Sequence, residues 1–198
     1  MGARGVATPK KRAARLSAVI LFLDETGLSV IPLVGKTWAP VGQTPVLRHN
    51  GHWDKVSAIA AVTPTGKLYF QMRLGSYDSA GVIEFLKDLL RHIRRRILLI
   101  WDNGLIHRSR DMQAFLHEQR RRLEVHRLPP YAPEVNPVEP FNSQLKFHKL
   151  KNYCPDTTEQ LLRTVRREVR RIQRDPKLVR SFFAQTPLGA VMQGRQKD

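Results

Sequence analysis

The sequence predicts an α/β domain built on an open sheet, with a functional site at one edge of that sheet. Two wholly apolar runs, 19–23 and 97–101, are typical of strands that are buried on both faces. Each run is followed directly by an aspartate, Asp24 and Asp102, and segments with helical spacing of apolar residues lie between and after them. Sites in open α/β sheets gather at the carboxyl ends of parallel strands. If the two strands are adjacent and parallel, both carboxylates lie at that edge.

The length and composition indicate one globular domain. The chain has 198 residues, of which 41% are hydrophobic and 26% are charged, enough for a buried core. We expect a flexible basic arm over 1–17, a core over 18–152, and a C-terminal helical extension over 153–198 packed on that core. The single cysteine, Cys154, excludes an intrachain disulfide and a cysteine-rich zinc site.

The charge balance points to a polyanionic partner. The chain carries 34 Lys and Arg against 17 Asp and Glu, a formal net charge of +17. Such a field attracts nucleic acids and anionic membranes alike. No apolar run approaches the roughly 18 residues that a membrane-spanning helix needs, so nucleic acid is the preferred interpretation. The N-terminal segment also lacks the apolar region of a secretory signal, which favours an intracellular protein.

The first half of the chain reads as strands joined by turns. Gly27 predicts a tight turn from the first strand into a second over 28–34. The segment 36–50 is rich in Gly and Pro and reads as an excursion, with Trp38 as its one large apolar anchor. A hairpin follows, with strands over 55–62 and 67–72 joined by a Thr-Pro-Thr-Gly turn.

The second half alternates helices and strands. Asp78 or Ser79 is placed to cap a helix whose apolar residues recur up to Ile93. A helix over 109–121, a strand over 123–128, a proline-rich loop and a helix over 138–150 follow. Asp156 and Glu159 stand at capping-box spacing before a last helix with one apolar stripe. Its other face is basic, and solvation and phosphate contact explain that face equally well: Arg163, Arg166, Arg167, Arg170, Arg171 and Arg174.

A third acid, Glu139, follows a proline-rich loop and opens the helix predicted there. Each of the three acids also has a structural explanation when taken alone. An aspartate after a strand often only starts a loop, and an acid in the first turn suits any helix.

Together, however, the segments around these acids resemble a known family. They are Phe-Leu-Asp-Glu-Thr-Gly at 22–27, Trp-Asp-Asn-Gly at 101–104 with His107, and Pro-Pro-Tyr-Ala-Pro-Glu-Val-Asn-Pro-Val-Glu at 129–139. They look like the motifs of the DDE transposases of the mariner-like insertion-sequence superfamily. The 36 residues between Asp102 and Glu139 are close to that superfamily's usual interval in the mid-thirties. The likeness runs over roughly 19–150, and its last motif is the most specific.

The resemblance implies a ribonuclease-H-like catalytic core over 18–152, with a mixed five-stranded sheet flanked by helices. It implies that Asp24, Asp102 and Glu139 bind two Mg²⁺ or Mn²⁺ ions, with Asp24 bridging both. Hard divalent cations prefer such oxygen ligands, and paired ions suit in-line displacement at phosphorus. The implied reaction is cleavage of the transposon ends, followed by transfer of the freed 3′-hydroxyls to target DNA.

Further residues match the family's motifs with less definite roles. Asn103 and His107 belong to the second motif, where they either support the metal site or DNA, or only shape the loop. Glu25 is either a supporting acid or a plain turn carboxylate. Trp38 lies where such transposases contact DNA or a partner subunit, although a core position explains it equally well. Arg166, Arg167, Arg170 and Arg171 are the candidate contacts on the last helix.

The resemblance also sets expectations for partners and location. The expected partners are double-stranded DNA, as transposon ends and as target, and a second copy of the chain in a homodimeric active complex. The expected location is the bacterial cytoplasm, in association with the nucleoid. Transposases of this kind carry an N-terminal helix-turn-helix region for end recognition, and only 18 residues precede Val19 here. We therefore expect a fragment, one frame of a split element, or a decayed remnant, with end binding supplied by another domain or chain. DNA affinity should be salt-sensitive and largely nonspecific.

Two other functions remain open at this point. One is a non-catalytic DNA-binding remnant or inhibitor, which the charge fits equally well but which has no need for three mutually repelling acids. The other is a ribonuclease-H-like nuclease with different substrates, which would share the fold and metals but not the proline-rich motif.

Overall fold

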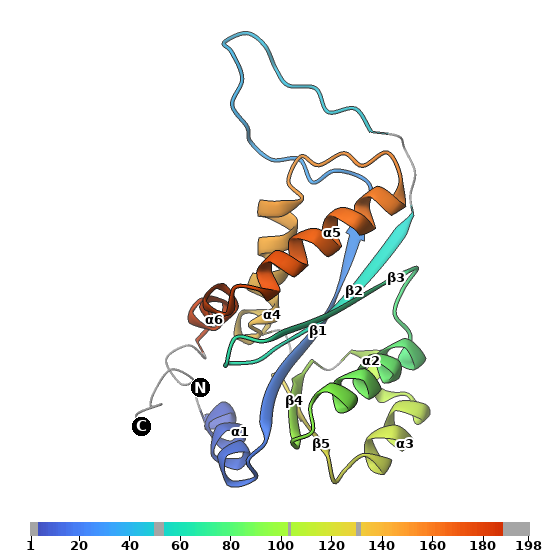
Figure 1. Cartoon of the computed structure of the whole chain (residues 1–198), viewed down its shortest axis with the longest axis vertical. Helices are drawn as coiled ribbons and strands as arrows, with labels where there is room; N and C mark the ends of the chain where they lie inside the picture. Colours follow the sequence, from blue (N-terminus) through green and yellow to red (C-terminus); the bar gives the residue numbers. More distant parts are fainter. Residues whose placement is uncertain (1–3, 50–53, 103, 130–131, 188–198) are drawn as a thin grey trace.

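A mixed sheet of five strands, in the order β3-β2-β1-β4-β5, forms the centre of the molecule (Figure 1). The computed structural model describes residues 4–49, 54–102, 104–129 and 132–187. The strands are β1 (Val19–Ser29), β2 (Lys55–Val62), β3 (Leu68–Leu74), β4 (Ile97–Trp101) and β5 (Leu123–Arg127). β1, β2 and β3 pair antiparallel, whereas β4 and β5 run parallel to β1. The predicted mixed five-stranded sheet is confirmed, and the condition that 19–23 and 97–101 form adjacent parallel strands is met.

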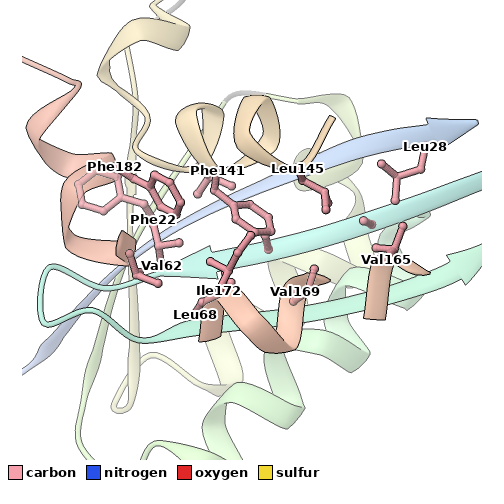
Figure 2. Close-up of a cluster of buried hydrophobic side chains, with 14 of the residues drawn as sticks. Phe22, Leu28, Val62, Leu68, Phe141, Leu145, Val165, Val169, Ile172 and Phe182 are labelled. Carbon is pink, nitrogen blue, oxygen red and sulfur yellow. The ribbon is translucent and has the colours of Figure 1, made fainter. Parts of the chain in front are cut away.

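Helices cover both faces of the sheet and enclose two apolar cores. One core lies under α2 (Ser79–His92) and α3 (Arg110–Glu118) and includes Leu21, Leu23 and Trp101. The other includes Phe22 and lies under α4 (Val138–Ser143), α5 (Thr158–Gln173) and α6 (Pro176–Ala184), as Figures 1 and 2 show. Successive side chains of a strand point to opposite faces. Neighbouring residues of β1 therefore enter different cores.

Local capping explains where the helices begin. The Asp78 carboxylate accepts from the Gly81 amide at the start of α2, and the Ser109 hydroxyl accepts from the Met112 amide at the start of α3. α5 is capped by Thr157, whose hydroxyl accepts from the Gln160 amide at 3.2 Å. The prediction of Asp156 as the capping residue is therefore wrong by one position. The predicted helix over 138–150 is observed as α4 continued by the π-helix η3 (Gln144–Lys149).

The predicted turn at Gly27 does not exist, because β1 continues through it to Ser29. Gly27 pairs with Ser57 in the ladder with β2, and Asp24, opposite Ala60, lies inside the strand instead of at its end. A Cβ at Gly27 would meet no atom within 4 Å, so the site does not require glycine for space. The long antiparallel ladder with β2 keeps the strand extended. The second strand expected over 28–34 is reduced to a single bridge between Leu33 and Lys151.

Two further expectations differ from the structure. The segment expected to be a flexible arm forms helix α1 (Arg4–Arg15), which packs Ala13 against the core and pairs Arg12 with Glu124 of β5. Trp38 is 99% exposed, so its interpretation as a core anchor is wrong, and it lies on a segment that projects beyond the sheet (Figure 1). Among the described residues, no helix has the length and apolarity needed to cross a membrane.

Candidate active site

Asp24 and Asp102 occupy equivalent places on neighbouring parallel strands. Phe22 pairs with Ile100 in the β1–β4 ladder, and each aspartate lies two residues further along its strand direction. Asp24 shares the sheet face of Phe22, where α4 packs. Its Oδ1 accepts from the Glu25 amide at 3.0 Å, and its Oδ2 accepts from the Asn142 side-chain amide at 3.3 Å. These two donors orient the carboxylate through both of its oxygens.

The first turn of α4 brings Glu139 to the same site. The buried side chain of Asn136 accepts from the Val138 amide at 3.1 Å, while its carbonyl accepts from the Glu139 amide at 3.0 Å. Asn136 thus caps α4 in place of Pro137, which makes no side-chain cap. The motif residues before Glu139 set where the helix starts, and so which side chain faces Asp24. Asn142 lies three residues after Glu139, on the same face of the helix.

Glu25 points to the opposite face of the sheet and meets a buried histidine. Its pairing partner Ile59 belongs to the core under α2 and α3. His107, in the short helix η1 (Leu105–Arg108), is 1% exposed and packs on Trp101 with ring centroids 3.5 Å apart. Its Nε2 lies 2.9 Å from Asp102 Oδ1 and 3.6 Å from Glu25 Oε2. Asp102 therefore neighbours both Asp24, on one face of the sheet, and Glu25, on the other face.

The electrostatics of the two aspartates are opposite. Burial, followed by repulsion from Glu139, Glu25 and Asp102, raises the pKa of Asp24 to about 8. The hydrogen bond from His107 holds the pKa of Asp102 below its ordinary value, with further help from the Gly104 amide and Arg127. Without a bound cation, Asp24 is largely protonated at neutral pH, whereas Asp102 is ionised. Neighbouring acids with separated pKa values are typical of functional sites.

The histidine is biased toward its charged form. Burial by itself lowers the pKa of His107, but the hydrogen bonds to Asp102 and Glu25 outweigh this effect and raise it. A proton on Nε2 is consistent with the short separation from Asp102. Protonated His107 would offset part of the negative charge around the two strand ends.

The donor set fits a divalent cation. Repulsion among four carboxylates is the condition that a bound cation relieves. Glu25, Asp102 and His107 offer ligand atoms that all lie within 4.8 Å of one another. Two buried oxygens at the site, Glu25 Oε1 and Asn142 Oδ1, have no hydrogen-bond partner among the described atoms. Oxygen-rich sets of this kind suit Mg²⁺ and Mn²⁺, and the imidazole nitrogen is tolerated better by Mn²⁺.

Arg127, which the sequence analysis did not single out, holds the loop between Asp102 and His107. Its Nη1 donates to the Asp102 carbonyl at 2.9 Å, and its Nη2 donates to the His107 carbonyl at 3.2 Å. The guanidinium also lies 5.2 Å from the centroid of the Trp101 ring. Burial lowers the pKa of Arg127 despite the nearby Asp102. Only an arginine offers two forked donors in this geometry.

The remaining predicted residues have different outcomes. Asn103 lies outside the described residues. Glu25 and His107 lie close to Asp102. Glu25 is part of β1 and is therefore not a turn residue. The four candidate arginines of α5 are exposed, and in the sequence they follow all three motif acids. The sequence patterns missed Asn142 and Arg127. Asn142 had a detectable signal, its three-residue spacing from Glu139. Arg127 had no such signal, because its position depends on the pairing of β5 with β4.

Comparison with known proteins places the chain in a family. The model of the DDE superfamily endonuclease family matches residues 19–162. The "Insertion element IS630 uncharacterized 39 kDa protein" of Shigella sonnei is 32% identical over 150 residues, which are 74% of this chain and 43% of that protein. The chain thus spans less than half the length of this curated relative.

Solved structures share the fold. The Mos1 strand transfer complex matches with a TM-score of 0.69 at 20% identity, over 96% of this chain and 59% of that one. The Mos1 mariner paired end complex with Mn matches with the same TM-score and identity, over 96% and 60%. The catalytic domain of Mos1 mariner transposase matches with a TM-score of 0.63 at 16% identity, over 97% and 95%. The sheet order and these matches give a ribonuclease-H-like fold, and, because the family model spans most of its length, this chain belongs to the DDE superfamily of endonucleases.

Proposed function

We propose that this chain is a transposase catalytic domain that cleaves DNA and transfers the resulting 3′-hydroxyl ends to target DNA. Asp24, Asp102 and Glu139 are its metal ligands. The observation that supports the proposal is the environment of Asp24, whose pKa is raised to about 8 by burial first and then by the negative charges of Glu139, Glu25 and Asp102. A protein that only binds DNA gains nothing from such repulsion. Two bound Mg²⁺ or Mn²⁺ ions would activate the attacking oxygen and stabilise the leaving oxygen of an in-line displacement.

The chain's own residues prepare the site for those ligands. Asn142 and the Glu25 amide orient the two oxygens of Asp24, and Asn136 starts α4 so that Glu139 faces it. Asp24 must lose its proton before it can act as a ligand, so metal affinity should rise as the pH approaches 8. His107 and Arg127 hold Asp102 and its loop. Glu25 and His107 are positioning residues in this scheme, and Asn103 is assigned a supporting role by its motif alone.

The partners follow from the same proposal. The substrate is double-stranded DNA, with the transposon ends and the target as its two sources. The active complex is a homodimer, in which the exposed Trp38 contacts DNA or the second subunit. The positive charge of the chain supports only the nonspecific part of its affinity for DNA.

Nicking of supercoiled plasmid DNA tests the proposal. We expect the chain to nick in Mn²⁺ and not in EDTA, and Asp102→Asn to lower the rate at least about 100-fold, because the variant loses a metal ligand. Asp111→Asn, in the exposed first turn of α3, is the control and should nick normally. A second readout is thermal stabilisation by Mn²⁺, expected for the chain and reduced for Asp102→Asn. A chain that binds DNA but neither nicks nor gains stability from Mn²⁺ would instead be a non-catalytic remnant.

Arg127→Lys should weaken Mn²⁺ binding by about 10-fold, in the range that partners of metal ligands usually contribute. Lysine keeps the charge but cannot donate to the Asp102 and His107 carbonyls together. The matched control is Arg122→Lys, because Arg122 also donates to two backbone carbonyls, those of Leu90 and Ile93, in another part of the chain. Both variants should lose similar stability without metal, measured by urea unfolding. Equal Mn²⁺ affinities, measured by calorimetric titration, would show that Arg127 has only a structural role.

A further inference from the structure

Helix α5 carries basic and apolar residues on opposite sides. The apolar residues Leu161, Val165, Val169 and Ile172 are buried against the sheet, as Figure 2 shows for Val165, Val169 and Ile172. The helix lies beside α4 over the same face of the sheet (Figure 1). Its opposite side is exposed and faces away from both cores. Six arginines occupy this exposed half and its flank: Arg163, Arg166, Arg167, Arg170, Arg171 and Arg174.

Two of the six arginines have a structural task. Glu168 is 5% exposed, and its Oε1 accepts from Arg167 Nε at 3.1 Å and from Arg171 Nη1 at 2.9 Å. Burial would raise the pKa of Glu168, but the two guanidinium groups outweigh it and lower the pKa. Arg167 and Arg171 therefore neutralise a buried acid at the edge of the helix. Their presence does not by itself indicate a ligand.

The other four arginines form a single row. Arg163, Arg166, Arg170 and Arg174 follow one another at steps of three, four and four residues. At 3.6 residues per turn, these positions fall within about 80° around the helix axis, directly opposite the buried face. The row extends over about 16 Å at 1.5 Å per residue. Within the described part of the chain, no ion pair to any of these four side chains is observed. Glu168 lies between them in the sequence but pairs with Arg167 and Arg171, and Asp175 caps α6.

A solvated helix face does not usually look like this. Exposed basic residues of ordinary helices alternate with acids at i,i+4 spacing, since like charges at that spacing destabilise the helix. Here the row holds four like charges, which are part of the formal net charge of +17 of the chain. One strand of duplex DNA presents a phosphate about every 3.4 Å along the axis. A row of about 16 Å therefore spans about five phosphates.

We infer that the row of Arg163, Arg166, Arg170 and Arg174 binds the phosphate backbone of duplex DNA without reading its sequence. The surface is distinct from the carboxylate site and does not need metal. Because α5 and α4 cover one face of the sheet, a duplex on this row lies on the side of the sheet to which Asp24 points. The choice of DNA as the polyanion rests on the proposed function, whereas the row itself does not.

Salt-dependent binding tests the inference. The affinity for a 30-base-pair duplex of arbitrary sequence is measured in EDTA by fluorescence anisotropy between about 50 and 200 mM salt. The variant replaces all four arginines of the row with glutamine and keeps Arg167 and Arg171, so that Glu168 stays neutralised. The control removes four other exposed basic residues in the same way: Lys67, Lys87, Arg94 and Arg121.

The row variant should lower the slope of log affinity against log salt by about 3 to 4, at about 0.9 per phosphate contact. The control should change it by less than about 1, and both variants should unfold near the temperature of the unmodified chain. Equal slopes for the row variant and the control would overturn the inference. The Asp102→Asn variant in the same assay separates the two proposals: it should bind like the unmodified chain, whether or not it nicks DNA.

Discussion

Asp24→Asn is expected to abolish Mn²⁺-dependent nicking and, at the same time, to make the metal-free chain more stable at pH 8. The rate should fall by about 10³-fold or more, a larger loss than for Asp102→Asn, because Asp24 is proposed to serve both ions. The gain in stability has a different origin. Asparagine carries no charge to be repelled by Glu139, Glu25 and Asp102, and it cannot be penalised for ionising in a partly buried position.

The pH dependence gives this prediction its sign. The pKa of Asp24 is raised in the folded chain from 3.8 to about 8, so the protonated form is favoured by folding. Its contribution to stability is complete below pH 4 and is lost as the pH rises toward 8 and above. Asp24→Asn should remove that loss and raise the free energy of unfolding at pH 8, by at most about 5 kcal/mol at about 1.4 kcal/mol per pKa unit. Bound Mn²⁺ should make the unmodified chain more stable than Asp24→Asn, since it stabilises only the chain with the carboxylate.

Urea unfolding of the metal-free proteins at pH 5, 6.5 and 8 measures the effect. Asp88→Asn is the control, because Asp88 lies on the surface of α2 in an ion pair with Arg91, and such pairs contribute little. Its stability should follow the same pH course as the unmodified chain. If Asp24→Asn also follows that course, or if it nicks DNA at the normal rate, Asp24 is not the repelled, metal-binding acid proposed here.

Phe141→Ala is expected to cause the largest loss of stability among single substitutions in the α4 layer. Phe141 is fully buried and makes edge contacts with Phe70 and Phe182, at centroid distances of 5.9 and 6.1 Å. Figure 2 shows Phe141 and Phe182 in this core. Truncating a buried phenylalanine costs about 3–5 kcal/mol, through lost burial and the cavity left behind. For a chain of this length, that corresponds to a fall of roughly 6–20 °C in the unfolding midpoint.

The same substitution should also reach the carboxylate site. Phe141 lies between Glu139 and Asn142 on α4, so a cavity beneath it frees the helix that positions both. We expect weaker Mn²⁺ binding by the folded fraction at low temperature. Phe147→Ala is the control on the continuation of the same helix, where the side chain is 55% exposed and should change stability by less than about 0.5 kcal/mol. Thermal scans with similar midpoints for the two variants would contradict the proposed role of Phe141 in the core.

Local pattern was sufficient for most elements, and its failures have physical causes. The run 97–101 and the apolar spacing before Ile93 predicted β4 and α2, because each element buries a face that its own sequence marks. Gly27 was misread as a turn because a glycine permits a turn without requiring one, and pairing with β2 kept the strand straight. For Trp38, apolarity made a core position as plausible as a contact with DNA or a partner subunit. The structure leaves it on the surface, where its role stays a prediction.

The sequence by itself determined the apolar strands, the starts of α2 and α3 and the three motif acids, since these depend on residues that are close along the chain. Only the tertiary structure decided how the acids are surrounded. The alternation of β1 sends Asp24 toward Asn142 and Glu25 toward His107, and the pairing of β5 with β4 brings Arg127 to the Asp102 loop. Those contacts join residues up to 118 positions apart. The burial and neighbouring charges that the fold creates shift the pKa values of Asp24 and Asp102, which no local pattern records.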